Sequence, residues 1–256
     1  MRHDYATVTE ISGEPVSTAQ VERLAQRYYW AAEYCRGKDV LEIACGSGQG
    51  LGYLASVARS VAGGDITPSL VEQAVKTYGS RLHVSLMDAE RLPFPNQSLD
   101  VVILFEALYY LPSGDRFVQE ARRVLRPGGM LLIASANKDL FDFNPSPFSV
   151  TYYGVVEMAE LLHRHGFSAR FFAGAPASQG GLAHTLIRVT KKTVVALHLM
   201  PKTMRGKRLL KRIVFGKLIP MPAEVPAGLR YEAPVAIDAT QPDTTHQVIF
   251  SAATRS

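Results

Sequence analysis

The chain has 256 residues, of which 47% are hydrophobic and 20% charged, and this composition is that of an ordinary globular protein with a sizeable core. Its two cysteines, Cys35 and Cys45, are too few for a disulfide framework or a four-ligand zinc site, so we expect no metal. The formal net charge is +5. The polar start MRHDYATVTE lacks a signal pattern, and no run of about 18 apolar residues could span a bilayer. We therefore expect a cytoplasmic protein that is at most peripheral to a membrane.

The first third of the chain alternates helix and strand signals. Ser17 followed by Gln20 is a capping-box pattern, which predicts a helix over residues 18–34. A predicted strand at 39–44 leads into a glycine loop and a helix over 48–58. The next predicted strand ends at Asp65, and Pro68 indicates a helix start, because a proline at the first helical position has no N–H to satisfy.

The middle of the chain continues this alternation. Strands are predicted at 82–86, 100–105 and 130–135, with a helix near 115–125. The runs VVILF and MLLIA are apolar throughout, which is typical of strands covered on both faces of a parallel sheet. After a long loop, a helix at 155–166 and strands at 169–174 and 247–254 complete a predicted α/β fold, with a doubly wound, mostly parallel seven-stranded sheet.

The glycine loop VLEIACGSGQG, residues 40–50, narrows the choice of ligand. A phosphate loop would end in Gly-Lys-Ser/Thr, which is absent here. A dinucleotide loop needs a glycine where Leu51 stands, and Glu42 would repel a pyrophosphate, although this alternative stays open. A ligand with an amino group, a cationic centre and a nucleoside, but no phosphate, suits a carboxylate beside the glycines.

Four motifs in order carry a resemblance to a known family. Glu42-Ile-Ala-Cys-Gly-Ser-Gly resembles the first motif of class I S-adenosylmethionine-dependent methyltransferases, and GGDITPSLVEQA, MDAERLPFP and LRPGGMLLIAS follow in the family's order over roughly residues 38–135. The resemblance implies S-adenosylmethionine as the cofactor, with Asp65 on the ribose hydroxyls, Ile66 on the adenine ring, and Asp88 with the Ala89 backbone on the adenine edge. The predicted cofactor-binding residues are Glu42, Gly46, Gly48, Gly50, Asp65, Ile66, Asp88, Ala89 and Phe105.

The residues after the fourth strand bear on catalysis. Many members of that family carry a Glu-His pair there, whereas this chain reads FEALYY, with two tyrosines in place of the pair. Glu106 is therefore the candidate general base, with a helix-start acid or an adenosine contact as alternatives. Tyr109 is a candidate acceptor contact, and the loop ANKDLFDFNPSPFS with the tyrosines after it adds Asn137 and Tyr152.

A finer resemblance concerns the acceptor. The segments VTEISGEP, RYYWAAEY, FEALYYL and ANKDLFDFNPSPFS are similar to bacterial methyltransferases of polysaccharide and sugar biosynthesis. This implies O-methylation of a sugar, nucleotide sugar or polysaccharide, and a leader segment, including Tyr5, that folds over the donor. A methyltransferase of a lipid, quinone or other small metabolite and a non-catalytic S-adenosylmethionine-binding protein stay open as alternatives, whereas nucleic-acid methylation lacks its catalytic motif.

We expect a single methyltransferase domain over 1–256, made of an N-terminal lid and helix (1–37), a donor-binding core (38–135), an acceptor-side region (136–174), a basic helical insertion (175–243) and the last strand (247–254). From Leu161 to Ala223 there are 12 Lys and Arg and no Asp or Glu, whereas the rest of the chain has 16 basic and 23 acidic residues. Helices are predicted over 185–200 and 203–219. They are interpreted as a packed appendage, or as a surface for an anionic membrane, an anionic acceptor or another subunit.

Overall fold

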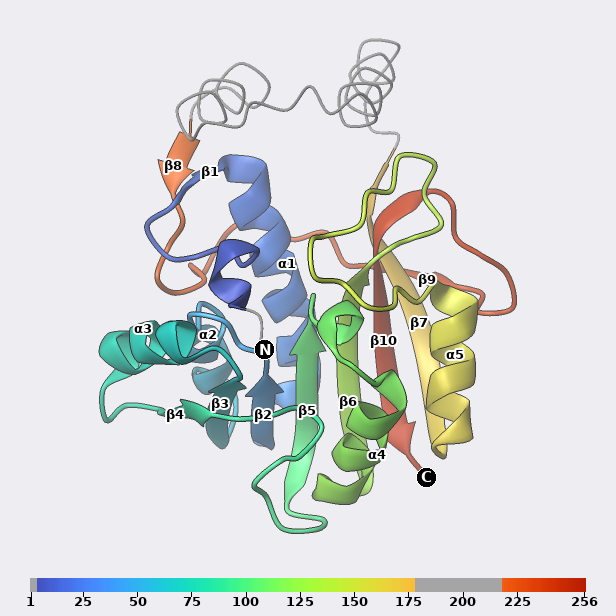
Figure 1. Cartoon of the computed structure of the whole chain (residues 1–256), viewed down its shortest axis with the longest axis horizontal. Helices are drawn as coiled ribbons and strands as arrows, with labels where there is room; N and C mark the ends of the chain where they lie inside the picture. Colours follow the sequence, from blue (N-terminus) through green and yellow to red (C-terminus); the bar gives the residue numbers. More distant parts are fainter. Residues whose placement is uncertain (1–3, 178–217) are drawn as a thin grey trace.

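The computed structural model describes residues 4–177 and 218–256 and contains an eight-stranded mixed sheet (Figure 1). The strand order is β4-β3-β2-β5-β6-β10-β7-β9. The strands are β2 Asp39–Ile43, β3 Ser60–Asp65, β4 His83–Leu86, β5 Leu99–Phe105, β6 Leu125–Ala136, β7 Phe167–Pro176, β9 Val235–Ile237 and β10 His246–Arg255. The five strands from β4 to β6 pair in parallel, whereas β10 is antiparallel to both β6 and β7. This confirms the predicted doubly wound, mostly parallel α/β fold.

Two layers of helices cover the sheet. Helices α1 (Thr18–Cys35), α2 (Leu51–Ala55) and α3 (Pro68–Tyr78) pack on one face, and α4 (Gly114–Val124) and α5 (Val155–Arg164) pack on the other. Strand β5 serves both layers, because successive side chains of a strand point to opposite faces: Val101 and Ile103 join the α1 layer, and Val102 and Leu104 join the α4 layer. Full burial of each such aliphatic side chain contributes about 1.5–3 kcal/mol, which explains why these runs are apolar throughout.

The local signals for helix starts hold. The Ser17 side chain accepts a hydrogen bond from the Gln20 backbone N–H, and the Gln20 side chain accepts one from the Ser17 backbone N–H, so the capping box at the start of α1 is confirmed. Pro68 is the first residue of α3. Helix α2 begins after Gly48 and not at the predicted residue 48, because Gly48 has a left-handed φ of 83° that a right-handed helix cannot include, and it ends at Ala55 instead of residue 58.

Two parts of the prediction need correction. The sheet has one strand more than the seven predicted, since β9 adds an antiparallel edge beside β7. The region 175–243 is not helical throughout, because Leu218–Pro220 form strand β8, which pairs antiparallel with β1 (Pro15–Ser17). The last two residues of the helix predicted over 203–219 therefore lie in a strand. The helix predicted over 185–200 and residues 203–217 lie outside the described residues.

The chain that follows β8 covers α1 and the glycine loop. Met221 and Val225 are buried in the same core cluster as α1. The Val225 N–H donates to the carbonyl of Gln49 at 2.8 Å, and the Tyr29 hydroxyl donates to the carbonyl of Pro226 at 2.5 Å. This segment thus fastens the start of α2 to α1.

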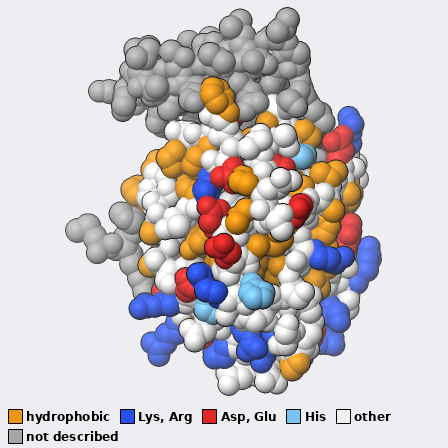
Figure 2. Space-filling view, turned by 90° about the vertical axis from the view of Figure 1, so that its right-hand side faces the viewer, with side chains coloured by type: hydrophobic (Ala, Val, Ile, Leu, Met, Phe, Trp, Pro, Cys, Tyr) orange, Lys and Arg blue, Asp and Glu red, His pale blue; other side chains and the backbone are white. Residues whose placement is uncertain are grey.

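The surface on the side of α5 mixes both signs of charge. Acidic side chains gather near the middle of this face and Lys and Arg follow its lower edge, with hydrophobic side chains between them (Figure 2). Most of the acid-free stretch 161–223 lies outside the described residues, so its basic patch stays a prediction. Within the described ranges, no helix is long and apolar enough to cross a membrane.

Candidate active site

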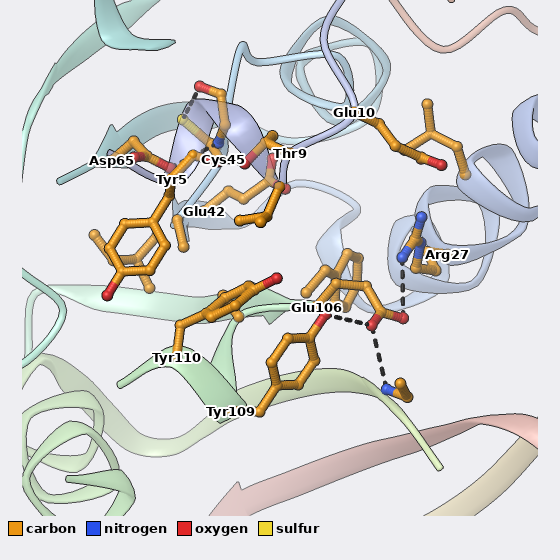
Figure 3. A pocket seen from close by; sticks show the side chains of 18 of the residues that line it. Tyr5, Thr9, Glu10, Arg27, Glu42, Cys45, Asp65, Glu106, Tyr109 and Tyr110 are labelled. Atoms are coloured by element: carbon orange, nitrogen blue, oxygen red, sulfur yellow. Dashed lines mark hydrogen bonds and ion pairs between the residues drawn. The ribbon is translucent and has the colours of Figure 1, made fainter. Parts of the chain in front are cut away.

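A cavity of about 760 Å³ opens at the carboxyl ends of β2 and β5. Strand order reverses between these two strands, and doubly wound sheets bind ligands at such a switch point. The volume falls within the range of small-molecule sites. Its lining divides into a glycine-loop side, made by the ends of β2 to β5, and an α1 side, made by α1, the N-terminal cap (residues 4–14) and the residues after β5 (Figure 3).

Three residues that line the cavity have left-handed backbones although they are not glycine. Ala44 follows β2 with φ 58°, Glu106 follows β5 with φ 52°, and Ala175 lies in β7 with φ 54°. Such residues cost of order 1–3 kcal/mol each and cluster at functional sites, where the surrounding structure holds them. Glu106 is thereby turned out of the strand direction toward the cavity.

Glu42 is the deepest acid on the glycine-loop side. Strand β2 carries it, it is 1% exposed, and its Oε1 accepts a hydrogen bond of 2.6 Å from the Tyr28 hydroxyl. Its Oε2 is buried and has no partner. Burial raises the pKa of Glu42 to about 7, against the opposing effect of the Tyr28 hydrogen bond. A buried carboxylate oxygen without a donor can accept from a ligand's amino group.

Asp65 lies at the end of β3, beside the glycine loop. Its Oδ2 accepts from the Gly46 backbone N–H at 2.9 Å, and its Oδ1 accepts from the Thr67 N–H at 2.8 Å. Burial raises the pKa of this carboxyl above its ordinary value. Each oxygen of a carboxylate has a second acceptor position, so Asp65 can still receive two hydroxyl groups.

The glycines of the loop have different tasks. Gly46 lines the cavity with a φ of 59°, and a Cβ there would lie 3.2 Å from the Thr9 side chain of the cap. Gly48 and Gly50 do not line the cavity, which corrects their prediction as cofactor contacts. A Cβ on Gly50 would overlap the Tyr28 ring at 1.7 Å, and one on Gly48 would lie 3.0 Å from Tyr78, so these two glycines permit close packing behind the loop.

The remaining predicted cofactor residues, Ile66, Asp88, Ala89 and Phe105, all line the cavity. Cys45 lines it as well, and burial raises the pKa of its thiol well above the ordinary value. A protonated, buried thiol is a poor nucleophile, which agrees with a packing role for this cysteine.

Glu106 is the centre of the α1 side. Its Oε1 forms an ion pair of 3.1 Å with Arg27, and its Oε2 accepts from the Tyr109 hydroxyl at 3.1 Å and from the Ala136 N–H at 3.2 Å (Figure 3). Burial alone would lower the pKa of Arg27, but the carboxylates of Glu106 and Glu10 raise it above its usual value. The carboxylate of Glu106 is therefore held in one orientation by three donors.

The two tyrosines predicted as acceptor contacts, Tyr109 and Tyr152, differ in their position relative to the cavity. Tyr109 lines the cavity, and burial together with Glu106 raises the pKa of its hydroxyl, so it stays a donor. Tyr152 stacks on Tyr109 at 4.3 Å between ring centroids but is not part of the cavity wall.

Asn137 also lies outside the cavity wall, which corrects its prediction as an acceptor contact. Its side-chain amide donates to the carbonyls of Asp243 at 2.7 Å and His246 at 2.9 Å, and its Oδ1 accepts from the Asp139 N–H. It ties the end of β6 to the turn before β10, and it is 1% exposed.

Several polar residues of the α1 side were missed from the sequence. They come from distant segments and are Glu10, Gln20, Arg23, Gln26, Arg27, Ser146 and Gln247. Arg23 and Arg27 are four residues apart in α1 and so share one helix face, which the sequence could have indicated. Glu10 and Gln247 carry no such signal. The cap contributes to the cavity wall, since Tyr5 lines it with its ring centroid 5.2 Å from that of Tyr110, and the lid over the donor stays a prediction.

Comparison with known proteins shows which family the chain is similar to. Residues 41–133 match the sequence model of the family described as "Methyltransferase domain". A probable S-adenosylmethionine-dependent methyltransferase of Mycolicibacterium smegmatis is 35% identical over 158 residues, which are 56% of this chain and 61% of that protein. A fatty-acid O-methyltransferase of the same species is 37% identical over 103 residues, 39% of this chain and 38% of that protein. The chain thus spans less than two thirds of the length of these relatives.

A solved structure supports the same fold. A methyltransferase from Thermotoga maritima, described as a possible histamine N-methyltransferase, superposes with a TM-score of 0.60 at 14% identity over 93% of this chain and 92% of that chain. Residues 41–133 are thus similar to a methyltransferase domain, and the chain shares the fold of S-adenosylmethionine-dependent methyltransferases. S-adenosylmethionine is the cofactor of this domain.

The residues present fit this cofactor. The unpartnered Oε2 of Glu42 suits its amino group, the two acceptor positions of Asp65 suit its ribose hydroxyls, and Ile66 and Ala89 form an apolar wall for the adenine. Gly46 has no side chain, so the cavity wall beside these residues is backbone alone. Among the described residues, no group of three His, Cys, Asp or Glu could hold a metal ion.

Proposed function

We propose that the protein transfers the methyl group of S-adenosylmethionine to a hydroxyl oxygen of a sugar, nucleotide sugar or polysaccharide. The observation that carries this proposal is the polar lining of the α1 side. Three glutamines, a serine, two arginines and two carboxylates stand there beside the Tyr109 and Tyr110 rings. Amides and carboxylates bind sugar hydroxyls, and aromatic rings pack on the apolar faces of sugars.

The chain's residues have distinct tasks in this reaction. When bound, the cofactor would supply an electrophilic methyl group to an oxygen nucleophile. Glu42 and Asp65 would hold its amino group and its ribose, and the cap would exclude water from the methyl group. The α1 side orients the acceptor and receives the hydroxyl proton. Glu106, predicted from the sequence as the general base, contributes a carboxylate fixed by Arg27, Tyr109 and the Ala136 N–H.

A fatty acid or other lipid carboxylate is the second candidate acceptor. One relative is a fatty-acid O-methyltransferase. The loop between β6 and α5 exposes Phe141 and Val150, which are 68% and 59% exposed, and an apolar acceptor could pack on them. Within the described part of the chain, the guanidinium of Arg23 bonds to the Gln247 side chain at 3.1 Å and forms no ion pair, so it could receive an acceptor carboxylate.

A transfer assay separates the two candidates. Purified protein is incubated with methyl-labelled donor and, in separate reactions, UDP-glucose, maltooligosaccharides and palmitate. The sugar proposal expects label in the first two, as an alkali-stable methyl ether. Label only in palmitate, released by alkali, would select the lipid alternative. Donor binding without transfer to any acceptor would favour a non-catalytic donor-binding protein.

A further inference from the structure

The proton of the acceptor hydroxyl must pass to a base, and the carboxylates of the cavity wall are candidates for this role. Six acids line the cavity: Glu10, Glu42, Asp65, Asp88, Glu90 and Glu106. Glu42, Asp65 and Asp88 belong to the glycine-loop side and are assigned to the cofactor. Glu90 accepts from the Ser113 N–H at 2.7 Å and lies 3.6 Å from Arg116, outside the α1 side. The choice on the α1 side is between Glu106 and Glu10.

Glu106 is poorly placed to receive a proton. Its carboxylate already accepts hydrogen bonds from the Tyr109 hydroxyl at 3.1 Å and the Ala136 N–H at 3.2 Å, and it forms an ion pair with Arg27 at 3.1 Å. Protonation would weaken the ion pair with Arg27, whose guanidinium is largely buried, and a buried cation without its carboxylate is costly. Glu106 is suited to holding Arg27 and Tyr109 in place around it.

Glu10 has fewer bonded partners than Glu106. Within residues 4–177 and 218–256 its carboxylate accepts one hydrogen bond, 2.9 Å from the Gln20 side-chain amide, and forms no ion pair. Burial lowers the pKa of both Arg23 and Arg27 in α1, and the charge of Glu10 opposes this effect, as the charge of Glu106 also does. Glu10 therefore lies near Arg27, as Glu106 does (Figure 3), and among the described residues only one of its carboxylate oxygens accepts a hydrogen bond.

Three contacts fix the position of Glu10 on the cap. The Gln20 amide that bonds its carboxylate is itself held by the capping box of α1. The Gln49 side chain of the glycine loop donates to the Glu10 backbone carbonyl at 2.6 Å. The neighbouring Thr9 side chain lies against Gly46. The cap thus carries Glu10 from the glycine loop toward the α1 side.

We propose that Glu10, carried by the N-terminal cap, is the carboxylate that receives the proton of the acceptor hydroxyl. The inference rests on the proposed function, methyl transfer to a hydroxyl oxygen. The acceptor O–H bond breaks as its oxygen bonds to the methyl carbon, and the methyl–sulfur bond breaks with its electron pair left on sulfur. The proton moves to a carboxylate oxygen of Glu10 and returns from there to water. Glu106 is then a positioning residue that orients Arg27 and Tyr109.

The first test needs no acceptor. Sinefungin carries an amine where the donor carries its methyl group, whereas S-adenosylhomocysteine carries nothing there. Calorimetry should show that Glu10→Gln lowers the affinity for sinefungin about fivefold or more, because the ammonium loses a nearby anion, and leaves the affinity for S-adenosylhomocysteine unchanged. Glu14→Gln, an exposed carboxylate of the same cap outside the cavity wall, should change neither.

An unchanged ratio of the two affinities in Glu10→Gln would overturn the proposal, whether or not the protein methylates sugars. If Glu10→Gln does not fold, Glu10→Asp serves instead, because it keeps the charge and withdraws it by one methylene. The ratio of its affinities for sinefungin and S-adenosylhomocysteine should lie between the wild-type ratio and the ratio of a protein that prefers neither ligand. A wild-type ratio would count against Glu10.

The second test uses an acceptor that the transfer assay finds. Glu10→Gln should lower kcat by roughly 100-fold or more with little change in acceptor KM, the range of a lost general base. The rise of kcat with pH in the wild type should disappear in this variant and persist in Glu106→Gln. Loss of that rise in Glu106→Gln alone would return the role to Glu106. Failure of the wild type to methylate any acceptor would remove the proposed function and leave the sinefungin result to decide whether Glu10 reaches the methyl position.

Discussion

The glycine-loop side and the α1 side of the cavity differ in how they are built. The first consists of strand ends and one loop, with Glu42 and Asp65 held by a tyrosine and by backbone N–H groups. The second is assembled from the cap, α1, the residues after β5 and β10, and its polar groups are held mainly by one another. A side fixed by backbone suits a constant ligand such as the cofactor, whereas a side made of contacting side chains can change with the acceptor.

This contrast has a direct consequence for mutations. Substitutions on the glycine-loop side should change the affinity for the cofactor. Substitutions on the α1 side should change turnover or acceptor KM, and substitutions behind either wall should change only stability.

The largest effect is expected for Asp65→Ala. The ribose hydroxyls of the ligand lose their charged acceptor, and a hydrogen bond to a charged group is worth about 1.5–3 kcal/mol, so the affinity for S-adenosylhomocysteine should fall by at least roughly tenfold in calorimetry. Asp238→Ala, an exposed turn carboxylate outside the cavity wall, is the control and should bind normally. Tight NAD binding without binding of the cofactor would contradict the assignment of this side.

Asn137→Ala should act on stability alone. It leaves the partly buried carbonyls of Asp243 and His246 without their donor, and the free energy of unfolding should fall by about 1–3 kcal/mol in urea denaturation. Cofactor affinity and acceptor KM should stay within twofold of the wild type. Asn144→Ala, on the exposed part of the same loop, should be neutral. A strong rise in acceptor KM would restore Asn137 to the acceptor site.

Glu42→Gln should lower the affinity for the cofactor and raise the stability of the ligand-free protein. The amide is a weaker acceptor for the cofactor's amino group, so affinity should fall by about 1 kcal/mol or more at pH 7. The folded pKa of Glu42, about 7, lies above its ordinary value of 4.5, so ligand-free wild-type protein loses stability as pH rises from 4.5 through 7. The variant lacks this loss, and its advantage in thermal denaturation should grow over that window. An advantage that does not change with pH would show that Glu42 is not the cause.

Tyr152→Phe should have the smallest effect. Its hydroxyl accepts from the Ser146 N–H at 3.0 Å, and losing that bond should cost about 0.5–1.5 kcal/mol of stability. The ring still stacks on Tyr109, so acceptor KM should change little. A KM several-fold higher would mean that Tyr152 touches the acceptor, as the sequence predicted.

The parallel core was predictable because the local sequence of each strand indicates it. Apolar runs such as VVILF follow from burial on both faces, and the capping box and Pro68 mark helix starts by their own backbone chemistry. Strands β1, β8 and β9 were missed because each has three residues and depends on a partner far along the chain, as Val16 does on Ile219.

The glycines show the same limit at the level of single residues. The sequence placed Gly46, Gly48 and Gly50 in one motif, but only the packing of Tyr28 and Tyr78 shows that two of them face inward. Asn137 was likewise read as a loop residue facing a ligand, whereas a turn about 106 residues later takes its amide.

The sequence by itself determined the fold class, the cofactor and the acids at the strand ends. These depend on short contiguous patterns and on the geometry of parallel strands, whose carboxyl ends meet at one edge. Only the tertiary structure decided which polar groups meet across the cavity, since Glu10, Arg27, Glu106 and Gln247 are brought together by the packing of the cap and α1 on the sheet. Their roles depend on distances and burial, which a spacing along the chain does not contain.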